Sequence, residues 1–208
     1  MVDFTKRYIH IDSNAKCTLE CPKCIRQHLR KINQPIPGHD LNVEDFIKLI
    51  DYFKGAVFCG QVSDPIFNPN LIEFLKICKE KNKYVDVHTA ATSKKHKKEW
   101  YKKAFEANLD CEWVFGIDGL PYQSFIYRIN QDGEFLFEMA KLAKEVGVKT
   151  VIWQYIIFGY NENSIDQAKE LATKYNIKLQ LNYSARWNKN TYDPYKPKDK
   201  EHIHPRLR

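Results

Sequence analysis

The stretch "RYIHIDSNAKCTLECPKCIR", from Arg7 to Arg26, joins a strand signature to three closely spaced cysteines. Its first five residues alternate with period 2, which predicts a short β-strand. Cys17, Cys21 and Cys24 then fall within eight residues, and no fourth cysteine lies beside them. Four explanations compete for this cluster: a disulfide staple, a zinc site, an iron–sulfur site and chance.

Strand signatures recur along the chain and alternate with helical patterns. Further short runs rich in β-branched and aromatic residues predict strands, and they span residues 56–60, 84–89, 112–117, 150–158 and 178–183. Between them apolar residues follow helical spacing, as at Phe46, Ile50 and Phe53. We expect Asn163 to cap the helix that follows it.

This alternation predicts an α/β fold with a parallel sheet and outer helices. Right-handed crossovers leave an open sheet or a full or partial barrel. Ligands bind at the carboxyl ends of the strands in both architectures, and the cysteine cluster follows the first strand at that edge. After Tyr183 the pattern fades into a polar, Pro-containing stretch, which we interpret as a tail or edge-covering extension with little independent structure.

The composition restricts the class of protein. The chain has 208 residues, of which 43% are hydrophobic and 28% charged, which is typical of one folded domain with or without a tail. No apolar run approaches the ~20 residues of a membrane helix, and the N-terminus lacks an apolar signal core. We therefore expect a cytoplasmic protein without a membrane partner. Thiols stay reduced there, which favours metal or redox chemistry over disulfides.

The net charge of +7 allows two kinds of partner, a nucleic acid or an acidic protein. The densest basic run, "KKHKKEWYKK", spans residues 94–103. We interpret it as a solvated helix face, so a nucleic acid is the less favoured partner.

The cysteine spacing separates the two metal explanations. Zinc takes four ligands in a tetrahedron, and here His10 or His28 would have to join the three thiols. An iron–sulfur cube takes one thiolate per iron, so three cysteines leave one iron open for a ligand. The remaining cysteines, Cys59, Cys78 and Cys111, are scattered singly.

C-x3-C-x2-C just after a first strand resembles the signature of the radical S-adenosylmethionine (radical SAM) superfamily, and later segments agree in order. "FCGQVSDPIFNPNLIEFL" (58–75) is similar to the second-strand "G-G-E-P" segment, and "VHTAATS" (87–93) to the third-strand segment. "VFGIDGL" (114–120) with "YRIN" (127–130) resembles the fourth-strand segment and its arginine. "WQYIIFGYNENSIDQAKELA" (153–172) resembles the branch that usually carries a C-terminal SPASM domain.

The chain departs from the family pattern at several positions. Lys23 replaces the usual aromatic residue before the third cysteine, Asp64 replaces Glu, and Ala90 stands where Asn is common. No cysteine follows Cys111, so the chain resembles the core without the auxiliary-cluster domain. The resemblance implies a partial (β/α)6 barrel of parallel strands with outer helices. It divides the chain into a radical SAM core domain, 1–186, and a polar C-terminal tail or extension, 187–208.

The resemblance also implies the cofactors and their contacts. Cys17, Cys21 and Cys24 would bind a [4Fe–4S] cluster whose fourth iron takes the amino and carboxylate groups of SAM. The backbone at Ser63 and the side chain of Asp64 would accept from the amino group, and Arg128 would pair with the carboxylate. Polar groups at strand ends would contact the ribose: Thr89, Asp118 and Gln154.

The implied function is that of a radical SAM enzyme, which cleaves SAM reductively to a 5′-deoxyadenosyl radical and abstracts hydrogen from a substrate. A peptide is the leading substrate class, and a nucleotide or small metabolite is the alternative. A low-potential donor, flavodoxin or ferredoxin, would dock on cations around the cysteine loop: Lys16, Lys23, Arg26, Arg30 and Lys31. The alternative from another class is a non-catalytic zinc or iron–sulfur binding module.

Overall fold

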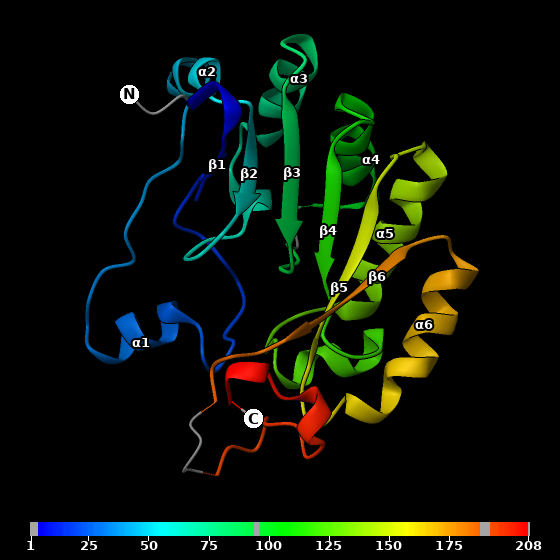
Figure 1. The fold of residues 1–208 in the computed structure, drawn as a ribbon. Coiled ribbons are helices and arrows are strands. Elements are labelled where there is room, and N and C mark those ends of the chain that lie inside the picture. Colours follow the sequence, from blue (N-terminus) through cyan, green and yellow to red (C-terminus); the bar gives the residue numbers. More distant parts are fainter. Residues whose placement is uncertain (1–3, 94–95, 188–191, 208) are drawn as a thin grey trace.

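Six parallel strands form one open sheet in the order β1-β2-β3-β4-β5-β6. The computed structural model describes residues 4–93, 96–187 and 192–207. The strands are β1 (Tyr8–His10), β2 (Gly55–Cys59), β3 (Tyr84–Thr89), β4 (Glu112–Gly116), β5 (Val151–Ile157) and β6 (Lys178–Tyr183). The predicted α/β fold is confirmed, and the open, curved sheet is a partial (β/α)6 barrel (Figure 1).

Helices connect the strands, and all but the first of them cover the outer face of the sheet (Figure 1). They are α1 (Ile25–Lys31), α2 (Val43–Tyr52), α3 (Leu71–Glu80), α4 (Lys98–Ala107), α5 (Gly133–Val146) and α6 (Ile165–Lys174). Asn42 caps α2, because its side chain accepts the Asp45 N–H. The predicted cap at Asn163 is wrong. Asn163 lies inside the 3₁₀ turn η4 (Glu162–Ser164), and Ser164 precedes α6.

The hydrophobic core lies between the sheet and these helices. Phe46 of α2, Phe58 of β2 and Phe74 of α3 are fully buried, and their ring centroids lie 4.3 to 5.8 Å apart. Each fully buried Phe contributes about 1.5–3 kcal/mol relative to an exposed one. The apolar stripes therefore hold the helices on the sheet and leave the strand ends free for other groups.

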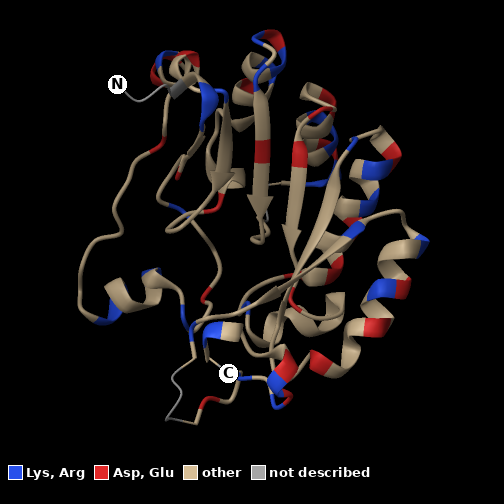
Figure 2. Cartoon of the chain, viewed as in Figure 1, with Lys and Arg blue, Asp and Glu red and all other residues tan. Residues whose placement is uncertain are grey.

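Charged residues are mixed over the outer helices (Figure 2). Several form pairs along one helix, such as Lys48–Glu44, Lys141–Glu138 and Lys169–Asp166. In the basic run 94–103, Tyr101 is fully buried, while Lys94 and Lys95 lie outside the described residues. No helix in the described part of the chain has the length and apolar character of a membrane span.

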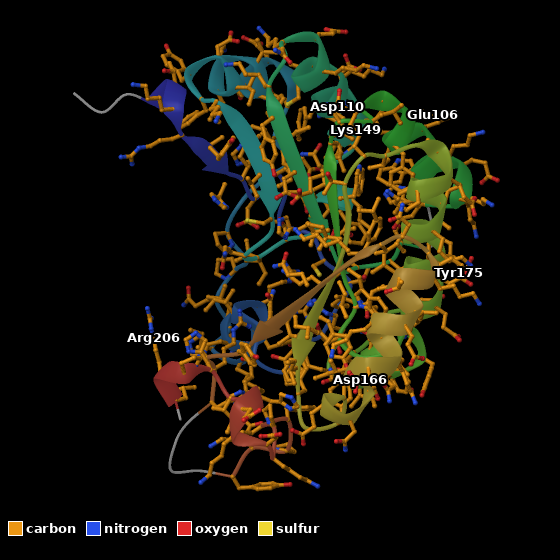
Figure 3. All side chains as sticks on the ribbon, turned by 45° about the vertical axis from the view of Figure 1, so that its right-hand side comes forward. Glu106, Asp110, Lys149, Asp166, Tyr175 and Arg206 are labelled. Atoms are coloured by element: carbon orange, nitrogen blue, oxygen red, sulfur yellow. The ribbon has the colours of Figure 1, made fainter. Side chains whose placement is uncertain are left out.

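The carboxyl ends of the strands meet at one edge of the sheet (Figure 1). Helix α1 and the C-terminal segment, which is the chain after β6 (described residues 184–187 and 192–207), lie at the same edge. Lys149 and Asp110 pair at the opposite edge, far from Arg206 of the C-terminal segment (Figure 3). The C-terminal segment is more ordered than its polar sequence suggests. Trp187 and Ile203 are buried in a cluster with Tyr127 and Phe158. Residues 188–191 and 208 of the predicted extension lie outside the described residues.

Candidate cofactor site

A cavity of about 270 Å³ opens at the carboxyl edge of the sheet, and all three clustered cysteines line it. Most of the predicted contacts line the same cavity: Ser63, Asp64, Thr89, Arg128 and Gln154. They come from the segments after β1, β2 and β4 and from β3 and β5. Residues more than a hundred positions apart in sequence therefore meet in one place.

The three cysteines are free thiols on the loop that leads into α1. Cys24 is the residue before α1, and its N–H donates to the carbonyl of Cys21 at 3.0 Å. Burial raises the pKa of Cys17 to about 12, with a further contribution from Asp64, and burial also raises the pKa of Cys21. Without a positive partner both groups stay protonated, so each thiolate needs a cationic ligand to form.

The grouping of possible metal ligands bears on the zinc and iron–sulfur alternatives. Among the residues that the structure describes, no three His, Cys, Asp or Glu side chains are grouped as one metal ion would need. A cube instead takes one thiolate per iron, so its ligands surround a volume. Neither of the two histidines considered for zinc is in the described lining of the cysteine cavity. His10 contacts Cys59, and His28 lines a neighbouring hollow together with Lys23 and Cys24.

The Asp64 carboxylate already accepts four hydrogen bonds from within the protein. It accepts from Thr89 Oγ1 at 2.9 Å, from Ala90 N and Ala91 N at 2.8 Å each, and from Ile66 N at 3.3 Å. These four donors match the roughly four lone-pair sites of a carboxylate. The side chain that was expected to accept from the SAM amino group is thus already satisfied. It joins the turn after β2 to the end of β3, and Thr89 is engaged in the same contact.

Asp12 holds the turn that contains Ser63. Its carboxylate accepts from the backbone N–H groups of Gln61, Val62 and Ser63 at 3.1 Å each and from Ser63 Oγ at 2.8 Å. A Cβ at Gly60 would overlap the Ser63 carbonyl oxygen, so this tight turn requires glycine. Asp12 was not predicted as a site residue. The signal was its place directly after the first strand, at the same edge as the cysteines.

Arg128 lies two residues after the 3₁₀ turn η3 (Pro121–Ile126), reaches the cavity wall and pairs with Asp118. Arg128 Nε lies 2.7 Å from Asp118 Oδ2, and Asp118 also accepts the Ile156 N–H at 2.9 Å. Burial alone would lower the pKa of Arg128, but Asp118 offsets this and the pKa is raised, so the guanidinium stays charged. Asp118 is fully buried and is absent from the described cavity lining. The structure thus places it behind Arg128.

Gln154 and two unpredicted side chains complete the inner wall. Gln154 pairs in register with Gly116 of β4 and Gln180 of β6. Cys59 and His88, neighbours in register on β2 and β3, line the same cavity. His10 Nδ1 lies 3.1 Å from the Cys59 sulfur, and His88 Nε2 lies 2.9 Å from Asp86 Oδ2. Alternation along the short strands was the signal for these inward positions.

The cations around the cysteine loop do not all face solvent. Arg26 is 7% exposed, and its guanidinium donates to the carbonyls of Ala15 and Val62, so its predicted place on a docking face is wrong. Lys16 pairs with Asp40, Arg30 with Glu20 and Lys23 with Asp193. Arg26 instead ties the loop to the turn after β2.

Comparison with known proteins identifies the family and the fold. Residues 13–172 match the family model of the radical SAM superfamily. The chain is similar to SuiB from Streptococcus suis bound to S-adenosylmethionine (TM-score 0.67, 16% identity, 94% of this chain and 44% of that chain). It is also similar to SuiB bound to the precursor peptide SuiA (0.65, 14%, 86% and 39%).

Two other solved structures share the fold. One is anSMEcpe with bound AdoMet and Cp18Cys peptide (TM-score 0.57, 13% identity, 87% of this chain and 54% of that chain). The other is methylornithine synthase, PylB (0.59, 15%, 84% and 52%). The chain spans less than half the length of SuiB. No curated protein matches it.

Proposed function

This chain belongs to the radical SAM superfamily, and from that premise we propose that it is an enzyme that cleaves SAM reductively and abstracts hydrogen from a substrate. The superfamily uses a [4Fe–4S] cluster and SAM, which together supply a 5′-deoxyadenosyl radical. We propose Cys17, Cys21 and Cys24 as the cluster ligands. The observation that carries the proposal is that three free thiols and five predicted SAM contacts line one cavity.

The chain's own residues would bind and orient SAM. Arg128, charged and fixed by Asp118, offers a guanidinium for the methionine carboxylate. The backbone at Ser63 remains our proposed acceptor for the amino group, because the Asp64 carboxylate is already occupied and the Val62 carbonyl accepts from Arg26. Gln154 remains our proposed ribose contact. We assign Thr89 and Asp118 supporting roles, since their side chains engage Asp64 and Arg128.

A peptide is our proposed substrate class. SuiB and anSMEcpe, which share the fold, were each solved with a peptide bound. The alternative, a small metabolite or nucleotide, is supported by the methylornithine synthase structure and by the size of the adjoining cavity, about 680 Å³. That volume lies within the usual range for small-molecule sites.

We also propose a low-potential flavodoxin or ferredoxin as electron donor and the cytoplasm as the location. Lys31, exposed on α1 beside the cysteine loop, remains a candidate docking cation. We retain residues 1–186 as the proposed core and 187–208 as its extension.

Anaerobic reconstitution tests the function. The protein is incubated with iron and sulfide, then with SAM and dithionite, and 5′-deoxyadenosine is measured by liquid chromatography. We expect product from the wild type and none from Cys21→Ala, whereas Cys78→Ala, a buried cysteine on α3, should retain it. An intact brown protein that forms no product would contradict the proposal. A colourless zinc protein would favour the binding module.

A further inference from the structure

A second cavity, of about 680 Å³, adjoins the cysteine cavity on its open side. The two share part of their lining, including Cys21, Cys24, Arg128 and Gln154. The outer wall of the second cavity comes from the chain after β6, through Ser184, Ala185, Arg186, His204 and Pro205. The C-terminal segment therefore faces the place where a substrate would approach the cofactor site.

Lys23 fixes this wall to the cysteine loop. Its ammonium group pairs with the Asp193 carboxylate, donates to the Arg186 carbonyl at 3.2 Å, and lies 5.1 Å from the centroid of the Trp187 ring. Arg186 Nη1 donates back to the Lys23 carbonyl at 3.1 Å. Trp187 itself is 4% exposed. The wall is thus built before any ligand arrives, and Lys23 has a structural role in place of the expected aromatic residue.

The charges on the wall select one kind of ligand. Apart from thiols and tyrosines, three charged or titratable side chains line the second cavity: Arg128, Arg186 and His204. No Asp or Glu of the described residues lines it. Asp118 already pairs with Arg128. The backbone N–H of Arg206 donates to His204 Nδ1 at 3.2 Å. Because Nδ1 accepts this bond, the proton of the neutral imidazole lies on Nε2. Arg186 and His204 therefore both present donors.

We propose that Arg186 and His204 form a binding site for an anionic group of the substrate, a phosphate or a carboxylate. The assignment to a substrate rests on the proposed function, because the site lies beside the cavity of the cysteines. The planar guanidinium of Arg186 fits both groups through paired N–H donors. Since Lys23 holds the backbone of Arg186, the site needs little reorganisation on binding.

A calorimetric titration tests the site directly. The full-length, anaerobically reconstituted chain is titrated with inorganic phosphate and, in a second arm, with acetate at constant ionic strength. We expect saturable binding that Arg186→Gln weakens at least tenfold. The control is Arg206→Gln, because Arg206 is exposed, lies outside the cavity lining and is displayed on the C-terminal segment (Figure 3). It should change the dissociation constant less than twofold.

The two arms identify the source of the anion. Tighter binding of phosphate supports a phosphorylated substrate, and equal or tighter binding of acetate supports a carboxylate. Binding that Arg186→Gln leaves intact, or no saturable binding in either arm, overturns the proposal. A parallel titration of the chain before reconstitution keeps this result separate from any failure of SAM cleavage.

A second variant tests whether the wall is held by Lys23. Lys23→Met should weaken phosphate binding and raise hydrogen exchange in residues 184–187 and 192–207, measured by mass spectrometry. Lys31→Met is the matched control. Lys31 lines the same hollow as Lys23 and Arg186, but among the described contacts it makes no hydrogen bond or ion pair with residues 184–187 or 192–207. Equal exchange in both variants would contradict the role of Lys23.

Discussion

At the scale of single residues, Cys17 makes the free energy of unfolding of the cluster-free chain depend on pH. Burial raises its pKa from 9.0 to about 12. The unfolded chain releases this proton at a lower pH than the folded chain, so its stabilising contribution is complete below pH 9 and is lost as the pH rises toward 12. One proton corresponds to about 1.4 kcal/mol per pH unit.

We therefore expect the free energy of unfolding of the cluster-free wild type to fall with pH above 9 more steeply than that of Cys17→Ala, by about 1.4 kcal/mol per unit. Urea unfolding under reducing conditions at several pH values between 8.5 and 10.5 measures both slopes. Other thiols and tyrosines contribute equally to the two proteins. Parallel slopes would show that Cys17 is not buried in this way.

Gly60 makes a second prediction at this scale. A methyl group there would overlap the Ser63 carbonyl oxygen, so Gly60→Ala should open the turn and weaken SAM binding, with a stability loss of about 2 kcal/mol or more. Gly147→Ala is the control, because Gly147 has a φ of 100° but no atom within 4 Å of its added Cβ. It should cost about 1 kcal/mol and leave SAM affinity, measured by calorimetry, unchanged. Equal affinities in both variants would refute the assignment of the turn.

The sequence predicted which side chains gather at this edge of the sheet, for a physical reason. The close cysteine spacing and the polar residues at strand ends are local signals, and the strand ends of a parallel sheet meet at one edge. The partners of those residues left none. Asp64 is saturated by Ala90, Ala91 and Thr89, and Asp118 lies behind Arg128. These pairings depend on how separate turns pack.

At the scale of elements, the strands were predicted to within one or two residues, because they are short runs rich in β-branched and aromatic residues. The helices were predicted from their apolar stripes, without bounds. The short helix α1 was not predicted, since only one turn of it carries a buried residue, Arg26. The cap at Asn163 failed because a 3₁₀ turn precedes α6 and the α-helix starts two residues later.

The turn η4 supports the C-terminal segment and yields a prediction. The Glu162 carboxylate accepts the backbone N–H groups of Lys198 and Asp199, at 3.1 Å each. Glu162→Gln removes the charge from these bonds, each worth about 1.5–3 kcal/mol. We expect hydrogen exchange of these two amides to rise about tenfold, as measured by NMR. Glu170→Gln, on the exposed face of α6, should leave them unchanged, and equal exchange in the two variants would contradict the contact.

At the scale of the whole molecule, the cysteine loop of the cofactor site and the proposed substrate wall come from opposite ends of the chain. The cysteine loop follows β1, and the wall follows β6, the other edge strand of the open sheet. Lys23 joins the two through Asp193 and Arg186. The polar composition of the C-terminal segment hid this packing, because a few buried residues, Trp187 and Ile203 among them, anchor it.

The most direct test of the central claim is electron paramagnetic resonance of the reconstituted chain, reduced with dithionite and recorded with and without SAM. Three thiolate ligands leave one iron open, so SAM bound there should change the spectrum of the reduced cluster. We predict a cluster signal in the wild type that SAM alters and that Cys21→Ala lacks. A reduced cluster whose spectrum is the same with and without SAM would contradict the account.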